Sequence, residues 1–274
     1  MKFRTIFIIF NIVILFAFLF VFFIPFFLFS FNESVSFWVQ NWPFVIFFIV
    51  ILLTFNLYFI KNWKIYTYLE HEQWEQLAEL LKKQIYEQHN FSKRVIRLYI
   101  NSALLSNNVQ AVINLEEYVK QQKPTVLEKN RIYFIVTRVL TNNYNAASQL
   151  LEGVTHDTTG EFNDWLVFYK GFIPIMQKEY SKALDPLRKL LKTKDPIIKL
   201  LALYLLKNIC LSALSDENEK ATVQQEVSVM TEMLKKQLTP KRWSMETERA
   251  KNEIPAVIIS SLIDEAGKWM FQTT

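Results

Sequence analysis

The residues that could do chemistry are few in this chain. His71 and Glu75 stand four residues apart, so on a helix they would share one face and could hold a metal ion together. A zinc-hydrolase helix of the form His-Glu-x-x-His would need histidine in place of Glu75, so we interpret this segment as a solvated acidic face. Cys210, the only cysteine, lies in an apolar stretch that is typical of a buried core residue rather than a nucleophile.

Motifs for binding a cofactor are also missing from the sequence. The four glycines never cluster into a loop that could cradle phosphate groups. We therefore predict a protein that is not an enzyme, with no catalytic residue, no metal and no cofactor. A dispersed catalytic site would leave no local signature, so an accessory subunit of a membrane enzyme stays open as an alternative.

The chain joins two segments of very different composition. Residues 1–60 contain 18 of the 24 phenylalanines and only three charged residues, Lys2, Arg4 and Glu33. In the remaining 214 residues about a quarter are charged, the usual proportion for a soluble domain. The average of 51% hydrophobic residues therefore describes neither segment, and a purely soluble protein is excluded.

Two apolar runs, residues 5–29 and 44–60, predict a hairpin of two transmembrane helices with spans of about 5–29 and 44–62. At about 1.5 Å per residue the first run is long enough to cross a hydrocarbon layer of about 30 Å. It is too long for a secretory signal and lacks a cleavage site of small residues. Asn11 and Asn56 are the only strongly polar residues in the runs, and either is expected to hydrogen-bond across the hairpin or to a neighbouring subunit. No ionisable residue lies inside the runs, which argues against a transporter.

Basic residues flank this predicted hairpin. Lys2 and Arg4 precede the first run and Lys61 and Lys64 follow the second, whereas the short loop expected at 30–43 has neither lysine nor arginine. The positive-inside rule then places both termini and the soluble part in the cytoplasm. We expect a multi-pass protein of the inner membrane.

Beyond residue 60 the sequence predicts only helices, because alternating β-branched runs and hairpin dipeptides are missing. Helix starts are indicated by Asp195-Pro196, by Thr239-Pro240, and by Thr125 with Glu128 as a capping box. Apolar or aromatic pairs also recur with spacings of 35, 35 and 36 residues, at Trp74/Leu77, Val109/Val112, Tyr144/Ala147 and Tyr180/Ala183. Each pair is expected to open the second helix of a two-helix unit, and stacked units would bury one continuous core.

The unit from Trp165 to Pro196 resembles the tetratricopeptide repeat. Gly171 falls at the small residue where the two helices of that repeat pack together, and Pro196 closes the unit one residue late. Lys170 and Pro174 stand where the family has apolar or aromatic residues, and the other units lack the glycine. The resemblance implies a degenerate tetratricopeptide-like α-solenoid.

The predicted fold is therefore all-α, with three parts. Residues 1–65 form the transmembrane hairpin, residues 66–215 form the tetratricopeptide-like repeats, and residues 216–274 form helices that cap the array.

In the tetratricopeptide family the first helix of each unit lines a concave surface where partner segments dock. Arg97 and Asn101 match the positions of basic and amide residues that clamp a peptide carboxylate in some members, and Arg94 shares their helix face. The resemblance thus implies a protein-binding groove that grades from basic to aromatic and suits an acidic, amphipathic segment. Its candidate partner-binding residues are Arg94, Arg97, Asn101, Arg131, Arg138 and Tyr169. The alternative is that these arginines are simply solvated.

We expect a membrane-anchored scaffold that binds and positions other proteins. The net charge of +5 is spread among interspersed signs, so nucleic acid is not an expected partner. A structural subunit of a large membrane assembly, as a homo-oligomer or a multi-protein complex, is an alternative.

The hairpin followed by KNWKIYTYLEHEQWEQL is similar to spirochaete membrane repeat proteins, some of which build the flagellar-motor collar. That resemblance implies repeats in the periplasm instead of the cytoplasm.

Overall fold

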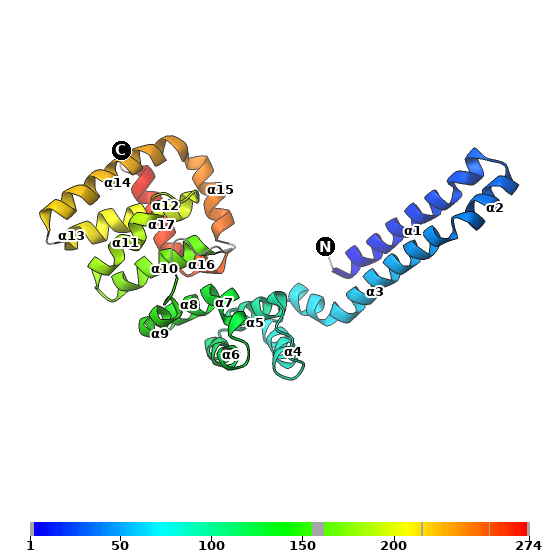
Figure 1. The fold of residues 1–274 in the computed structure, drawn as a ribbon, viewed down its shortest axis with the longest axis horizontal. Helices are drawn as coiled ribbons and strands as arrows, with labels where there is room; N and C mark the ends of the chain where they lie inside the picture. The colour runs from blue at the N-terminus through cyan, green and yellow to red at the C-terminus, as the bar shows by residue number, and fades with distance from the viewer. Residues whose placement is uncertain (1–2, 155–161, 215, 252, 273–274) are drawn as a thin grey trace. The chain divides into compact units, whose positions relative to one another are not determined.

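The computed structural model describes residues 3–154, 162–214, 216–251 and 253–272 (Figure 1). These residues are predominantly helical and contain no strand, which confirms the all-α prediction. The chain divides into two compact units, Met1–Asn90 and Phe91–Thr274. Lys2, on which the predicted orientation partly rests, lies outside the described residues.

The described helices of the first unit are α1 (Phe3–Leu28), α2 (Phe31–Gln40), α3 (Trp42–Glu70) and α4 (Trp74–Tyr86). The second unit begins with α5 (Lys93–Leu105), α6 (Val109–Gln122), α7 (Pro124–Lys129), α8 (Arg131–Leu140) and α9 (Tyr144–Leu150). It continues with α10 (Asn163–Met176), α11 (Tyr180–Leu190), α12 (Pro196–Leu205), a π-helical turn (Leu206–Cys210) and α13 (Leu211–Ala213). It ends with α14 (Glu217–Gln237), α15 (Pro240–Ala250), α16 (Ile254–Val257) and α17 (Ser260–Gln272).

Helices α1 and α3 lie side by side as an antiparallel hairpin, and both are long and apolar enough to cross a membrane (Figure 1). Stacked rings join them near both ends, with centroids 4.5 Å apart for Phe3 and Tyr66 and 4.4 Å apart for Phe18 and Phe48. Between these rings the side-chain amide of Asn56 donates a hydrogen bond of 2.9 Å to Asn11 Oδ1. The expected bond across the hairpin is therefore present, and it is worth about 1 kcal/mol in lipid.

The segment between the two long helices is mostly helical, so the prediction of a loop at 30–43 was wrong. Helix α2 begins after Ser30, whose backbone N–H and hydroxyl both donate to the carboxylate of Glu33, at 3.1 and 2.8 Å. Helix α2 also packs on α1. The hydroxyl of Ser34 donates to the carbonyl oxygen of Pro25 at 2.9 Å, and the indole N–H of Trp38 donates to the carbonyl oxygen of Phe22 at 3.1 Å. Sequence reasoning missed this helix because it took the few polar residues as a turn.

A third stretch, Pro196–Ala213, is also apolar enough to span a membrane by composition, but 56% of it is buried inside the second unit.

Two of the predicted helix starts in this unit are confirmed. Asp195 accepts hydrogen bonds from the backbone N–H groups of Ile197 and Ile198, and Thr239 accepts one from Arg242. The capping box at Thr125 was wrong, because α7 already begins at Pro124.

The recurring pairs mark four helix hairpins with one common turn. The first residue of each pair is the first residue of α4, α6, α9 or α11, as predicted, and the second residue is fully buried in all four. Two residues before each pair stands a residue with positive φ: Glu72 at 53°, Asn107 at 57°, Asn142 at 55° and Lys178 at 62°. These residues repeat the spacing of 35, 35 and 36.

Backbone hydrogen bonds close each turn in the same way. The N–H of the residue after the positive φ reaches back five residues to a carbonyl of the preceding helix, over 2.8 to 2.9 Å, at Gln73, Asn108, Asn143 and Glu179. This bond and the left-handed residue are the elements of a Schellman motif, which ends one helix and allows the next to return beside it. Accordingly α3 packs on α4, α5 on α6, α8 on α9 and α10 on α11.

Gly171 lies on α10 where this helix packs against α11. A Cβ atom at this position would lie 2.6 Å from Leu187 Cγ and 2.8 Å from Leu187 Cδ2, too close for any side chain without a shift of α11. The glycine therefore serves the helix-packing role that the resemblance assigned to it.

Lys178 tests the contribution of the left-handed turn to stability. A lysine at φ 62° is strained by its Cβ, whereas glycine is not, so Lys178→Gly should stabilise the fold by about 1 kcal/mol. Chemical denaturation of the full chain in detergent measures this change. The control Gln224→Gly, in the exposed middle of α14, should destabilise by about 1 kcal/mol. Destabilisation by both variants would contradict the assigned turn.

Candidate functional site

A cavity of about 650 Å³ opens in the second unit. It is lined by side chains of α5, α8, the start of α10, the start of α12 and the C-terminal α15–α16 region. Arg97 and Asn101, two of the residues singled out from the sequence, lie together in its wall. The helical spacing of four residues places them on the same face of α5.

Arg97 is held in place by aromatic rings and an amide. Its guanidinium carbon lies 5.1 Å from the ring centroid of Tyr133 and 5.1 Å from that of Phe162, and both rings also line the cavity. Its Nε donates a hydrogen bond of 3.4 Å to Asn130 Oδ1, and Asn130 is itself buried and fixed by donating to the Val126 carbonyl oxygen at 2.8 Å. Cation–π contacts of this kind contribute about 0.5–2 kcal/mol, so the charged group is oriented before any partner arrives.

Asn101 contributes an acceptor that is not used within the described chain. Its Oδ1 is enclosed by protein and accepts no hydrogen bond from the described residues. An enclosed amide oxygen without a donor costs about 1–3 kcal/mol. A ligand or a water that donates a hydrogen bond here, after a small rotation of the amide, would recover part of that cost.

The rest of the cavity wall carries acidic groups. Asp164 accepts a hydrogen bond from the hydroxyl of Thr193, and Glu253 accepts one of 3.2 Å from the indole N–H of Trp165. Asp195 caps α12, and its burial raises the pKa of its carboxyl above the ordinary value even though two backbone N–H groups act in the opposite direction. These three carboxylates lie in the lining with Arg97 and Arg249, so the cavity has mixed charge and is not the basic groove that we expected.

The other predicted arginines lie elsewhere. Arg94 is exposed on α5 and does not line the cavity. Arg131 is half-buried at the start of α8, with Glu128 3.9 Å away. Arg138 forms two hydrogen bonds, of 2.9 and 3.2 Å, with the carboxylate of Glu116, and their side chains are only 12% and 10% exposed. This pair joins α6 to α8 inside the unit.

The aromatic part of the expected groove is covered by the chain itself. Tyr169 is fully buried, and its hydroxyl donates a hydrogen bond of 2.7 Å to the carbonyl oxygen of Pro255. Its burial also raises the pKa of the Tyr169 hydroxyl. Because α16 is apolar and buries Pro255 and Ala256, it occupies the surface that the resemblance had left to a partner. Tyr169 therefore binds the protein's own C-terminal segment in this structure.

The residues considered for catalysis are placed as follows. Cys210 is fully buried, and burial raises the pKa of its thiol to about 11, so little thiolate forms at neutral pH. Among the described residues, no group of three or more His, Cys, Asp and Glu side chains is arranged to hold a metal ion. His71 lies at the end of α3, and Glu75 lies in the first turn of α4, so the two residues do not share a helix.

The acidic half of the cavity was missed by sequence reasoning. Asp164, Asp195 and Glu253 come from three segments that only the tertiary fold brings to one wall. The sequence signal at Asp195 was its position before a proline, which indicated a helix cap and nothing about a cavity.

The chain is similar to uncharacterised proteins of Treponema. A family model described as "Uncharacterised Treponema protein" matches residues 111–272, more than half of the chain and most of the second unit. A protein of Treponema pallidum (strain Nichols), described as "Uncharacterized protein", is 26% identical over 243 residues, covering 85% of this chain and 77% of its own. No solved structure matches the chain.

The Arg138–Glu116 pair gives a test of which predicted arginines are structural. Glu116→Ala leaves the guanidinium of Arg138 buried without its counter-charge, so it should destabilise the fold by about 3 kcal/mol. The double variant Glu116→Leu/Arg138→Met removes both charges and should stay within about 1 kcal/mol of the wild type. Thermal and urea unfolding of the full chain measure both. Equal losses in the single and double variants would show that packing, rather than the ion pair, decides the effect.

Proposed function

The chain belongs to the family described as "Uncharacterised Treponema protein", and we propose that it is a membrane-anchored scaffold that binds and positions partner proteins without catalysing a reaction. The observation that carries this proposal is the cavity in which Arg97 is already oriented and Asn101 offers an unused acceptor. Two apolar helices at the start of the chain provide the anchor.

The scaffold is proposed to be a tetratricopeptide-like α-solenoid. Four hairpin turns with the same backbone geometry support this reading, as does the close packing of Gly171 against Leu187. Contacts also link the hairpins of the second unit, because α6 packs on α8 and α9 packs on α10. Repeated units of this kind bury their cores between neighbours and present their first helices for binding.

The cavity suits a short polar segment of a partner protein. A volume of about 650 Å³ lies within the range of pockets that bind small ligands, and it would hold a few residues of a peptide. A carboxylate of the partner would approach the guanidinium of Arg97 on one side, whereas Asn101, Asp164 and Glu253 would accept hydrogen bonds from N–H groups on the other. The partner segment should therefore carry both an acidic group and several donors.

Arg97→Glu tests whether the cavity binds a partner. The substitution places a negative charge beside the acidic wall, so it should remove cavity-dependent partners from crosslinked, affinity-purified complexes in native membranes, a loss of about 10-fold or more. Arg94→Glu makes the same change of charge three residues earlier on α5, outside the cavity, and should keep the partners. Partner lists that are unchanged by Arg97→Glu would contradict the cavity as the binding site.

We further propose an inner-membrane location with two spans and with both termini in the cytoplasm. The charges at the two ends of the hairpin support it, since Lys61 and Lys64 lie on α3 while α2 carries Glu33 and no lysine or arginine.

Cysteine labelling tests this orientation. In a Cys210→Ser background, Ser36→Cys places a thiol on the exposed face of α2, and a membrane-impermeant maleimide should label it from outside the inner membrane. The control Thr222→Cys, exposed on α14, should react only after the membrane is permeabilised. The reverse pattern, with Thr222→Cys labelled from outside, would place the soluble part in the periplasm.

A structural subunit of a large membrane assembly, such as a spirochaete flagellar-motor collar, is the second candidate. The observation that favours it is that the family and the relative both come from Treponema, a genus of spirochaetes. This candidate differs from the scaffold because it requires many copies of the chain in one assembly.

A further inference from the structure

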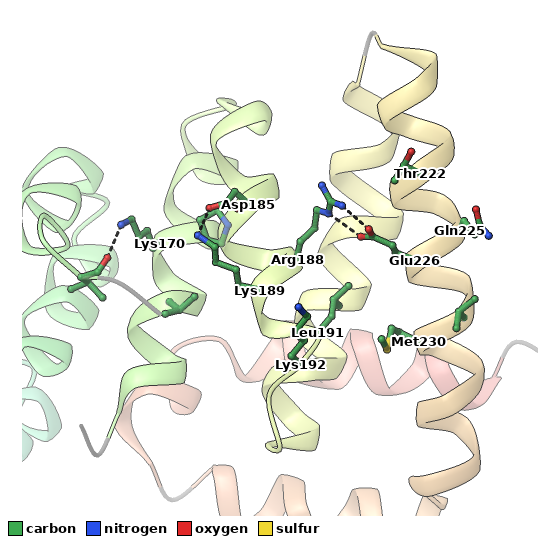
Figure 2. Close-up of a pocket in the computed structure, with 14 residues that line it drawn as sticks. Lys170, Asp185, Arg188, Lys189, Leu191, Lys192, Thr222, Gln225, Glu226 and Met230 are labelled. Carbon is green, nitrogen blue, oxygen red and sulfur yellow. Dashed lines mark hydrogen bonds and ion pairs between the residues drawn. The ribbon is translucent and has the colours of Figure 1, made fainter. Parts of the chain in front are cut away.

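A second and larger hollow, of about 1260 Å³, lies in the second unit between α10–α11 and α14 (Figure 2). We call it the α11–α14 groove and define it by Lys170, Arg188, Lys192, Val229 and Met230. None of its lining residues belongs to the cavity around Arg97, so it is a separate surface.

An ion pair bridges the two walls of the groove. Arg188 on α11 donates hydrogen bonds of 2.9 and 2.6 Å to the two carboxylate oxygens of Glu226 on α14, as Figure 2 shows. Planar, two-point contacts of this kind fix the relative orientation of the groups that they join. The width of the groove is therefore set in the absence of a partner.

The α14 wall presents apolar side chains to solvent. Val229 is 52% exposed and Met233, one turn further along, is 51% exposed, while Met230 lies between them in the lining. These three residues form a stripe at helical spacing, in which Val229 and Met233 are exposed and Met230 is half-buried. Methionine side chains are flexible and polarisable, and they adapt to the shape of an apolar partner.

The charges around this apolar stripe are unbalanced. The lining contains four cationic side chains, Lys170, Arg188, Lys189 and Lys192, but only two acidic ones, Asp185 and Glu226. Both acids already accept hydrogen bonds from cations, Glu226 from Arg188 and Asp185 from Lys189 at 2.7 Å. The Nζ of Lys170 donates to the carbonyl oxygen of Val154 at 2.6 Å. This carbonyl group carries no net charge, so it does not neutralise the lysine. Among the described residues of the lining, the two positive charges at Lys170 and Lys192 thus have no acidic counterpart.

We propose that the α11–α14 groove docks an amphipathic helix of a partner protein that carries carboxylates beside its apolar face. Excess positive charge beside an exposed apolar stripe is complementary to such a helix. It does not complement a basic segment or a purely apolar segment. On α14 the lining extends from Thr222 to Met230, about 12 Å along the axis, which matches about two turns of a docked helix. The apolar face of the partner would cover Val229 and Met230, and its carboxylates would face Lys170 and Lys192.

A designed peptide tests this proposal with the full-length protein in detergent micelles. The probe is a fluorescein-labelled helical peptide of about 16 residues, with leucines at i, i+3, i+4 and i+7 and glutamates flanking that face. One control peptide scrambles the same residues and so loses the apolar face, and another replaces every glutamate with lysine. Fluorescence anisotropy should show that the acidic amphipathic peptide binds at least about 10-fold more tightly than either control.

Variants of the protein then locate the binding site. Val229→Glu and the double variant Lys170→Glu/Lys192→Glu should each weaken binding of the acidic peptide by about 10-fold or more. Gln224→Glu, exposed on α14 outside the groove, should leave it unchanged. Circular dichroism confirms that each variant folds before binding is compared.

Three outcomes would overturn the proposal. The first is equal binding of the acidic and scrambled peptides, or no binding of either. The second is binding that survives both groove variants. The third is self-association of the protein that Val229→Glu abolishes and the acidic peptide does not compete with, because the occupant would then be a second copy of this chain.

Discussion

One residue with left-handed backbone at each helix hairpin is the constraint on which the rest of the soluble structure depends. This residue ends the first helix of the hairpin. The N–H of the next residue bonds back to the first helix, and this turn allows the second helix to pack beside the first. The turn recurs every 35 or 36 residues, and in the second unit α8 contacts α10 and Arg97 on α5 comes close to Tyr133 on α8. Asn107 and Asn142 tolerate this conformation, whereas Glu72 and Lys178 do not prefer it, so tertiary packing must hold the turn at those two positions.

The sequence therefore predicted the periodic part of the fold better than the site. Buried anchors such as Leu77 and Ala183 repeat at a fixed interval, and periodicity of this kind needs no knowledge of tertiary contacts. Helix α2 was missed because a short helix that packs on its neighbour has little signal of its own. For the cavity, Arg97 and Asn101 were found through a resemblance to a repeat family, whereas Glu253 reaches the wall only because α16 folds onto α8.

The C-terminal helices change what the array can do. In a plain repeat array the first helices would offer a long groove, but here α16 fills the aromatic part of that surface and Tyr169 is bonded to its backbone. The second unit has a compact cavity of mixed charge and a separate groove with an apolar stripe and excess positive charge. These two surfaces differ in chemistry, so under the proposed function they would select different partner segments, and the chain would hold two proteins near one membrane.

The central claim is that the cavity around Arg97 is where a partner binds. It is tested most directly by a photocrosslinking amino acid placed in living cells at Arg249, which lies exposed in the cavity lining, and separately at Gln110, exposed on α6. The account predicts a discrete adduct with another protein from position 249 and none from position 110. Adducts of equal yield from the two positions, or no adduct from position 249, would contradict it.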